Sequence, residues 1–316
     1  MKIAILDDYQ NVALKSADWS SLPEECEVEV FTEHFSSPNI VKERLRDFEV
    51  IVAMRERTPF SRDILAGLPG LKLLITTGMR NASIDLVAAN DLGILVCGTG
   101  GRGFATAELA WGLILALMRH IPLEDSATRQ GQWQTTIGTE LMNKTLGIVG
   151  LGNLGSRMAI IGKSFEMTVI AWSQNLTSEK AAQFGATLVP KEELFTGSDI
   201  VTLHLQLSER TRGLIGRREL SLMKPTAYLI NTSRGPIIDE AALIDILKSR
   251  SIAGVGLDVY DHEPLPVDHP LRYLDNTVVT PHLGYVTSET YKVFYEDSVE
   301  NISSYLNGQP IRVLNP

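Results

Sequence analysis

The chain has 316 residues, of which 44% are hydrophobic and 21% are charged. At about 100–200 residues per domain this length predicts two domains, and the apolar content is enough for packed cores, which excludes disorder over most of the chain. The 29 Lys and Arg residues against 38 Asp and Glu give a net charge of −9. A broad basic surface for nucleic acid or anionic lipid is therefore excluded.

The cysteines and the most apolar segments indicate the compartment. Cys26 and Cys97 have no spacing typical of a metal site or a disulfide framework. The N-terminal apolar run is too short for a signal peptide. The most apolar stretch, Phe104–Met118, includes Glu108 and is too short to span a bilayer. We therefore expect a cytoplasmic protein with no metal and with no membrane or nucleic-acid partner.

The first third of the chain alternates short β-branched runs with polar, helix-compatible stretches. This alternation predicts a parallel sheet with helices on both faces. The predicted strands are Ile3–Leu6, Val28–Phe31, Val50–Ala53, Leu71–Ile75 and Ile94–Val96. A long helix follows from Thr106 to Arg119, and we expect Pro122, just after His120, to close it.

A second series of strands begins after this helix. The predicted strands are Leu146–Val149, Val169–Trp172, Leu188–Val189, Ile200–Leu205, Tyr228–Asn231, Val255–Val259 and Val278–Thr280. The chain returns to helical spacing from Ser288 to Leu306, where the apolar residues recur at intervals of three and four. Because this apolar side must cover a surface, and the first sheet offers one, we predict a discontinuous first domain. It comprises residues 1–97 and 288–316, around an inserted domain of residues 98–287.

The sequence Gly150-Leu151-Gly152-Asn153-Leu154-Gly155 follows an apolar strand and precedes a helix. In this G-x-G-x-x-G pattern the first glycine allows a tight turn, the second lets the backbone approach a pyrophosphate, and the third allows close packing of helix on strand. The N–H groups at the helix N-terminus favour phosphates. A glycine turn can also be purely structural, but the strand and helix around it favour a dinucleotide site.

The next strand ends in Ser173, where such sites usually have an acidic residue for the adenosine ribose. A carboxylate there would repel the 2′-phosphate of NADP, so its absence removes one barrier to that cofactor. No arginine takes its place, and the nearest downstream cation is Lys180. The residues leave NAD and NADP open.

Further blocks follow in a fixed order. After the turn come Leu194–His204, Met223–Gly235, Leu257–Tyr260, Glu263-Pro264 and Thr280–Gly284. In order and spacing these resemble the signatures of the D-isomer-specific 2-hydroxyacid dehydrogenases, which include phosphoglycerate dehydrogenase and glyoxylate/hydroxypyruvate reductase. The resemblance implies an α/β fold with two Rossmann-like domains: a flavodoxin-like, discontinuous substrate domain and an inserted, doubly wound NAD(P)-binding domain. It further implies interconversion of a small anionic 2-keto acid and a D-2-hydroxy acid. A homodimer is also implied, for which the helix Thr106–Arg119 is the expected contact unless its apolar face lies in the core.

The resemblance carries the catalytic roles to Arg234, Glu263 and His282. Arg234 suits a substrate carboxylate and keto oxygen because its guanidinium is planar and permanently charged. His282 can exchange a proton with the carbonyl oxygen, and Glu263 can orient and support it. Without the resemblance, each residue has a simpler interpretation. Arg234 would be a surface ion-pair partner, Glu263 a loop residue and His282 a turn residue. The other histidines are expected to be structural or exposed: His34, His120, His204, His262 and His269.

Cofactor and substrate contacts also follow from the resemblance. The implied cofactor contacts are Gly150, Gly152, Asn153, Leu154, Gly155, Ser173, Thr106, Leu205, Thr232, Ser233, Asp258 and Gly284. Thr106 is otherwise an ordinary helix-start residue. The loop Thr76–Asp85 is expected to receive the substrate carboxylate on its N–H groups, with Gly78, Met79 and Arg80 joining Arg234 as substrate contacts. Arg80 stands where the family has glycine, and it either reaches a second anionic group or pairs with Asp85.

Two other functions remain as alternatives. Formate dehydrogenases share the fold but pair glutamine with the histidine, whereas this chain has Glu263. The dinucleotide-sensing corepressors of the family retain the same three catalytic residues, so these residues do not exclude a non-catalytic scaffold. A further departure is Gln206, which stands where the second signature has proline, and it puts the shape of that loop in doubt.

Overall fold

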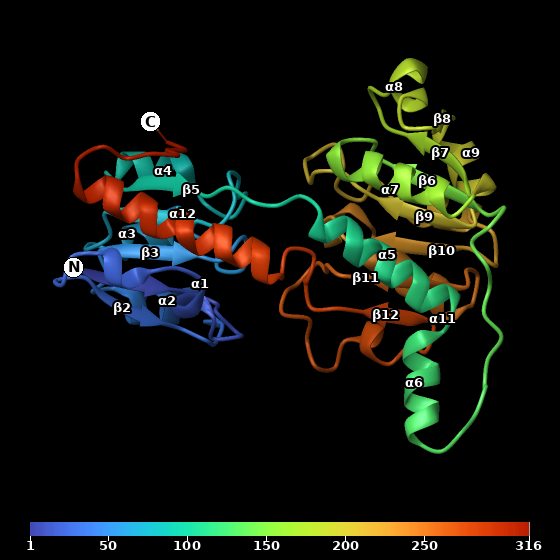
Figure 1. Ribbon diagram of the computed structural model, residues 1–316, viewed down its shortest axis with the longest axis horizontal. Coiled ribbons are helices and arrows are strands. Elements are labelled where there is room, and N and C mark those ends of the chain that lie inside the picture. The colour runs from blue at the N-terminus through green and yellow to red at the C-terminus, as the bar shows by residue number, and fades with distance from the viewer. Residues whose placement is uncertain (316) are drawn as a thin grey trace. The chain divides into compact units, whose positions relative to one another are not determined.

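The computed structural model describes residues 1–315, which form two compact units. The split unit comprises Met1–Arg102 and the described part of Val286–Pro316, and the inserted unit is Gly103–Tyr285. The chain therefore crosses between the units twice, once after Arg102 and once after Tyr285 (Figure 1).

The split unit contains a five-stranded parallel sheet in the order β2-β1-β3-β4-β5. This order is that of flavodoxin-like sheets, in which ligands bind beyond the carboxyl ends of the strands near the β1/β3 switch point. The strands are β1 (Lys2–Ile5), β2 (Glu27–Val30), β3 (Val50–Ala53), β4 (Leu73–Thr76) and β5 (Leu95–Gly98). The helices are α1 (Ala13–Ser16), α2 (Pro38–Leu45), α3 (Arg62–Ala66), α4 (Leu86–Asp91) and α12 (Ser288–Leu306).

The last segment of the chain completes this unit. Apolar side chains of α2, α3 and α4 share a core with the strands, while α12 packs against α1. The Asn301 amide of α12 donates to the Gly98 carbonyl at the end of β5 (2.8 Å). Residues 312–315 then run along the edge of β5, where the Gly98 N–H donates to the Arg312 carbonyl and the Leu314 N–H donates to the Val96 carbonyl.

The inserted unit contains a seven-stranded parallel sheet in the order β12-β11-β10-β9-β6-β7-β8. If the strands are numbered 1 to 7 from β6 to β12 and the sheet is read from β8, the order is 3-2-1-4-5-6-7. This is the dinucleotide-binding order 3-2-1-4-5-6 with β12 added at the edge. The strands are β6 (Thr145–Val149), β7 (Thr168–Trp172), β8 (Thr187–Leu188), β9 (Ile200–Leu203), β10 (Tyr228–Asn231), β11 (Gly254–Leu257) and β12 (Thr277–Val279). The helices are α5 (Ala105–Met118), α6 (Ile121–Arg129), α7 (Asn153–Ser164), α8 (Ser178–Ala182), α9 (Lys191–Gly197), α10 (Arg217–Leu222) and α11 (Glu240–Lys248).

Two separate cores cover the faces of this sheet. Side chains of α5 and α7 share one core with Ile148 and Ile230, and side chains of α9, α10 and α11 share the other with Val149 and Leu229. Neighbouring strand residues thus point to opposite faces, as a sheet covered on both sides requires. The predicted α/β fold with two Rossmann-like sheets is confirmed, and each predicted strand lies within two residues of an observed one.

The prediction that Pro122 closes the long helix is wrong. The helix α5 ends at Met118, His120 adopts a left-handed backbone conformation (φ 52°), and α6 begins at Ile121 with Pro122 in its first turn. Proline lacks only an N–H that the first turn of a helix leaves unpaired, so it starts the second helix here.

Candidate active site

Three adjacent strands of the inserted unit bring the predicted catalytic residues to one edge of the sheet. β11 pairs with β10 and with β12, so that Leu257 lies opposite both Asn231 and Val279 at the strand ends. Arg234 follows β10, Glu263 follows β11 and His282 follows β12. Because the strands are parallel and in register, all three loops leave from the carboxyl edge, where open α/β sheets bind ligands.

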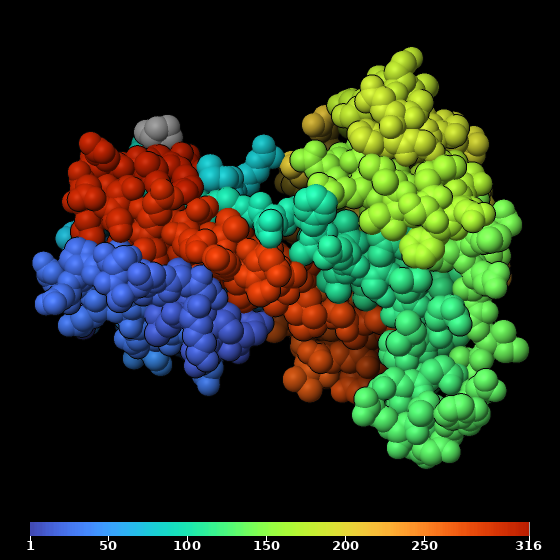
Figure 2. Space-filling model, viewed as in Figure 1, coloured from blue at the N-terminus to red at the C-terminus, as the bar shows by residue number. Residues whose placement is uncertain are grey.

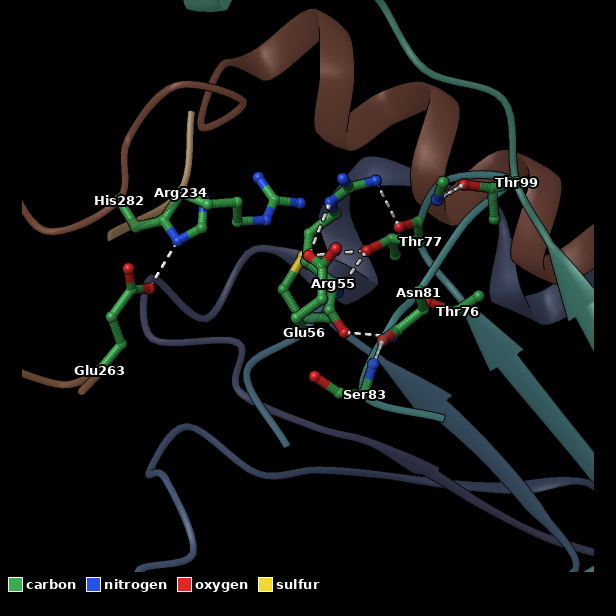
Figure 3. Close-up of polar contacts among 12 residues, drawn as sticks. Arg55, Glu56, Thr76, Thr77, Asn81, Ser83, Thr99, Arg234, Glu263 and His282 are labelled. Atoms are coloured by element: carbon green, nitrogen blue, oxygen red, sulfur yellow. Dashed lines mark hydrogen bonds and ion pairs between the residues drawn. The ribbon is translucent and has the colours of Figure 1, made fainter. Parts of the chain in front are cut away.

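His282 and Glu263 form a close pair. The Nδ1 atom of His282 lies 2.6 Å from Oε2 of Glu263, and the side chains are 16% and 29% exposed (Figure 3). The other carboxylate oxygen, Oε1, accepts the Tyr260 N–H (3.0 Å). A carboxylate at Nδ1 favours the tautomer with its proton there, which leaves Nε2 to meet a reacting group.

Asp258 holds the loop that carries His282. Its carboxylate is fully buried and accepts hydrogen bonds from the Thr280 hydroxyl (2.6 Å), the Leu283 N–H (2.7 Å) and the Gly284 N–H (2.8 Å). Burial raises the pKa of Asp258, and these donors together with the nearby His282 oppose that rise. The cofactor contact that the family resemblance implies for Asp258 stays a prediction, and the bonds seen here go to the loop that carries His282.

The loop with Arg234 packs directly against the loop with Glu263. A Cβ atom on Gly235 would lie 2.0 Å from the Tyr260 carbonyl carbon, so the two backbones can approach only because residue 235 is glycine. Within the loop, the Asn231 amide donates to the Arg234 carbonyl (2.9 Å), and the Ser233 hydroxyl donates to the Leu203 carbonyl of β9 (2.6 Å). Arg234 therefore extends from a turn that its neighbours hold on both sides.

The glycine-rich turn fits a dinucleotide. Gly150 has φ +98°, and a Cβ atom there would lie 2.4 Å from the His204 carbonyl oxygen. A Cβ atom on Gly155 would lie 2.0 Å from the Gly150 carbonyl oxygen, whereas one on Gly152 would meet nothing within 4 Å. Helix α7 begins at Asn153 with no side-chain cap and no acidic residue in its first turn. Its first N–H groups are thus open to a phosphate.

Buried polar atoms at the ends of β9 and β10 also suit a polar ligand. Within residues 1–315, the Thr232 hydroxyl and the Nδ1 atom of His204 are buried and have no hydrogen-bond partner. His204 directly follows Leu203 and Thr232 directly follows Asn231, and Leu203 and Asn231 lie opposite each other in the sheet. Burial lowers the pKa of His204 to about 4, so its ring is neutral near pH 7. The sequence prediction was a cofactor contact for Thr232 and a structural or exposed position for His204.

Other predicted cofactor residues lie around this edge. Ser173 directly follows β7 and is half-buried, and Leu205 lies against Gly150, where an added Cβ would come within 2.8 Å of its Cδ2. The Thr106 hydroxyl donates to the Gly284 carbonyl (2.8 Å), and the N-cap residue of α5 is Phe104, so Thr106 does not cap this helix. Gln206 is exposed, and its carbonyl accepts the Thr211 hydroxyl (2.7 Å), which closes the loop that lacks the family's proline.

In the split unit, the predicted substrate loop leaves the carboxyl end of β4. Gly78 is buried with φ +96°, and its N–H already donates to the Thr99 hydroxyl (2.8 Å) rather than standing open for a substrate. Met79 and Arg80 are exposed. The Asp85 carboxylate accepts the Ala88 N–H at the start of α4 (2.8 Å), which gives it a role as a helix cap.

Sequence reasoning missed two residues that hold this loop, Arg55 and Asn81. Arg55 follows β3 in a left-handed conformation (φ 51°), and its guanidinium donates to the Thr77 carbonyl (3.1 Å). The Asn81 amide donates to the Arg55 carbonyl (2.6 Å) and to the Thr76 hydroxyl (2.9 Å) (Figure 3). The only signal in the sequence is that Arg55 directly follows an apolar strand, and this is common for surface arginines.

The described chain offers neither a metal cluster nor a helix for a membrane. No group of three or more His, Cys, Asp or Glu side chains among residues 1–315 could hold a metal ion. None of the helices in that range is long and apolar enough to cross a membrane.

Comparisons with known proteins agree on one family. Residues 111–284 match the family described as D-isomer specific 2-hydroxyacid dehydrogenase, NAD binding domain. A glyoxylate reductase from Aeropyrum pernix is 40% identical over 257 residues, which are 78% of this chain and 77% of that one. A D-3-phosphoglycerate dehydrogenase from Methanocaldococcus jannaschii is 36% identical over 98% of this chain, which spans only 58% of that relative's length.

Solved structures of similar fold agree. The crystal structure of a phosphoglycerate oxidoreductase from Vibrio cholerae superposes with a TM-score of 0.93 at 37% identity, covering 98% of this chain and 99% of that one. The apo-structure of D-lactate dehydrogenase from Escherichia coli has a TM-score of 0.86 at 27% identity, with 99% and 100% coverage. The protein therefore belongs to the D-isomer-specific 2-hydroxyacid dehydrogenases, a family of NAD(P)-dependent oxidoreductases.

Proposed function

We propose that the inserted unit binds NAD(P) and that Arg234, Glu263 and His282 interconvert a 2-keto acid and a D-2-hydroxy acid. The observation that carries this proposal is the 2.6 Å contact between His282 Nδ1 and Glu263 Oε2, on loops from adjacent strands. The glycine turn, with its open helix N-terminus, fits the pyrophosphate of the cofactor. When bound, the nicotinamide supplies the hydride for the keto carbon.

In reduction, His282 donates the proton. The new C–H bond uses both hydride electrons, the carbonyl π pair moves to the oxygen, and Nε2 of His282 protonates that oxygen to form the hydroxyl. Glu263 stabilises the protonated imidazole through its charge and keeps the ring oriented through Nδ1. In oxidation the same nitrogen accepts the hydroxyl proton. Arg234 binds the substrate carboxylate through its planar pair of N–H donors, and so fixes the carbonyl relative to His282.

We propose glyoxylate and hydroxypyruvate as the first substrates to test, because the A. pernix relative, named a glyoxylate reductase, is similar over most of both chains. A specific observation favours phosphohydroxypyruvate as a second candidate. The guanidinium of Arg55 lies on the Gly78 loop, where an added Cβ would come within 1.9 Å of its Nη1. The same guanidinium lies 3.7 Å from Glu56 Oε2, and a cation held in place after β3 favours a substrate with a second anionic group.

A substrate panel tests the proposal. Reduction of glyoxylate, hydroxypyruvate, pyruvate and phosphohydroxypyruvate is followed with NADH and with NADPH. His282→Ala should remove most turnover and leave NADH binding nearly intact, and retained turnover would refute its role. A protein that binds NADH but reduces none of the four acids would instead support a dinucleotide-sensing scaffold.

We also propose a homodimer, for which α6 and the chain after it are the contact. Apolar residues gather there at high exposure: Ile121 (52%), Leu123 (54%), Trp133 (78%) and Ile137 (94%). Figure 2 shows the green atoms of this segment standing out from the rest of the inserted unit. For the apolar face of α5 the family resemblance left a dimer contact and the core open, and that face lies in the core of its own unit. Such an exposed apolar group fits a second copy of the same surface.

Light scattering after gel filtration tests the dimer. Ile137→Asp should produce a monomer because it places a charge within the buried contact. Val267→Asp is the matched control, since Val267 is 80% exposed on another part of the same unit. A wild-type monomer, or a dimer that Ile137→Asp leaves intact, would refute the proposed contact.

A further inference from the structure

Thr106 lies where the two segments that connect the units come together. The chain enters the inserted unit after Arg102 and leaves it after Tyr285. Thr106 is four residues after Arg102, and Gly284 directly precedes Tyr285. The Thr106 hydroxyl donates to the Gly284 carbonyl at 2.8 Å, so one side-chain hydrogen bond links the entering segment to the leaving one.

Gly284 is tightly packed between Thr106 and Asp258. A Cβ atom there would lie 3.2 Å from Oγ1 and Cγ2 of Thr106 and 3.2 Å from Oδ2 of Asp258. The Gly284 N–H donates to the Asp258 carboxylate and its carbonyl accepts from Thr106, so both polar groups of this peptide backbone are held from opposite sides. Gly284 is buried. Its position is thus determined by Asp258 and Thr106 together.

His282 needs such support because of its own backbone. Its φ of +55° lies in the left-handed region, which is uncommon for non-glycine residues and costs conformational energy that the surrounding contacts must offset. On one side, the Thr280 hydroxyl binds Asp258. On the other, the Leu283 N–H also binds Asp258, and the ring of Tyr285 packs edge-on against the imidazole with centroids 5.4 Å apart. The segment after His282 therefore has to stay in place for both the backbone and the ring.

We infer that Thr106 is a positioning residue for His282. Its hydroxyl holds the Gly284 carbonyl, and with it the segment 283–285 whose N–H groups and aromatic ring keep His282 in its left-handed, oriented state. This inference rests on the proposed catalytic role of His282. It assigns Thr106 a role different from the cofactor contact that the family resemblance implies.

Two substitutions separate the hydroxyl from the shape of the side chain. Thr106→Val keeps the shape and removes the donor, and Thr106→Ser keeps the donor. Thr187→Val is the matched control, because Thr187 is exposed on the edge strand β8. The measurements are kcat for keto-acid reduction, the Kd of NADH by fluorescence titration, and amide hydrogen exchange at Leu283 and Gly284.

The expected result follows from the loss of one buried hydrogen bond. Thr106→Val should lower kcat about fivefold and speed exchange at Leu283 and Gly284 by a similar factor, with the Kd of NADH within about twofold of wild type. Thr106→Ser and Thr187→Val should match the wild type in all three. A raised NADH Kd with unchanged exchange in Thr106→Val would overturn the inference in favour of a cofactor contact. A Thr106→Val variant that matches the wild type in all three measurements would overturn the inference as well. If the wild type reduces no keto acid, the proposed function fails, whereas unchanged exchange in Thr106→Val would overturn the positioning role by itself.

Discussion

Replacement of Glu263 by glutamine tests the His282–Glu263 pair most sharply, because both carboxylate oxygens are in use. Oε2 meets His282 Nδ1 at 2.6 Å, and Oε1 accepts the Tyr260 N–H at 3.0 Å. Glutamine has the same shape but one acceptor oxygen and no charge. It can therefore satisfy either the imidazole or the Tyr260 N–H, and it cannot stabilise a charged ring electrostatically.

The size of the effect follows from this geometry. A hydrogen bond to a charged group contributes about 1.5–3 kcal/mol, and both partners here are less than one-third exposed, so solvent weakens the bond only in part. Loss of this stabilisation of the protonated imidazole should slow keto-acid reduction at neutral pH roughly 10- to 100-fold. Oxidation needs the neutral ring and should suffer less at the same pH.

The assay is steady-state reduction and oxidation between about pH 6 and about pH 9, with the Kd of NADH and the thermal midpoint measured for each variant. Glu263→Ala is the companion variant, and it should be slower still because it also loses the orientation of the ring. The reasoning would be refuted if Glu263→Gln reduced keto acids within about twofold of the wild type across this range while remaining folded.

Three further predictions concern the rest of the inserted unit. Gly235→Ala should lower the free energy of unfolding in urea by about 2–3 kcal/mol, because the added Cβ meets the Tyr260 backbone at 2.0 Å. The control is Gly112→Ala, which should not destabilise the protein because an added Cβ there meets nothing within 4 Å. Equal stability of the two variants would contradict the packing argument. Ser173→Asp should lower kcat/KM for NADPH about tenfold or more and leave that for NADH nearly unchanged, and a parallel loss for both cofactors would place Ser173 away from the ribose. The folded-state pKa of His204 is lowered to about 4 from 6.5, so the stability that this neutral ring contributes is present above about pH 6.5 and is lost as pH falls towards 4. Between pH 7 and pH 4.5 this contribution changes by about 2 kcal/mol, and His204→Gln should remove that part of the pH dependence of urea unfolding; an unchanged pH dependence would show that His204 is not its source.

The sheets and the catalytic edge were predictable for a common physical reason. Parallel strands covered on both faces are mainly apolar runs, as in Val50–Ala53 and in Ile200–Leu203, where Thr202 is the one polar residue, and every residue of both strands is buried. The strand-turn-helix around Gly150 is a local pattern as well, since a few adjacent residues determine it. Residues that directly follow such strands could therefore be placed at a sheet edge from their position in the chain alone.

The contacts that could not be predicted from the sequence join distant segments. Arg55 and Asn81 are 26 positions apart, and Thr106 and Gly284 are 178 apart. No local pattern marks an amide that holds a neighbouring loop or a hydroxyl that meets a remote carbonyl. The boundary at Pro122 was misjudged because the same ring that ends one helix is favourable in the first turn of the next.

The pairing of residues 312–315 with β5 has a consequence for folding in the cell. The Val96 N–H binds the Asn315 side chain across 219 positions, so the edge of this sheet is covered only after the whole inserted unit has been synthesised. An open strand edge is a template for association with other chains, and contacts of such long range form late. During translation the split unit must therefore wait, incomplete, while the inserted unit can fold first as a contiguous segment. Nascent chains of this protein should be most prone to aggregate, and most dependent on chaperones, in the interval between the synthesis of β5 and that of the final residues.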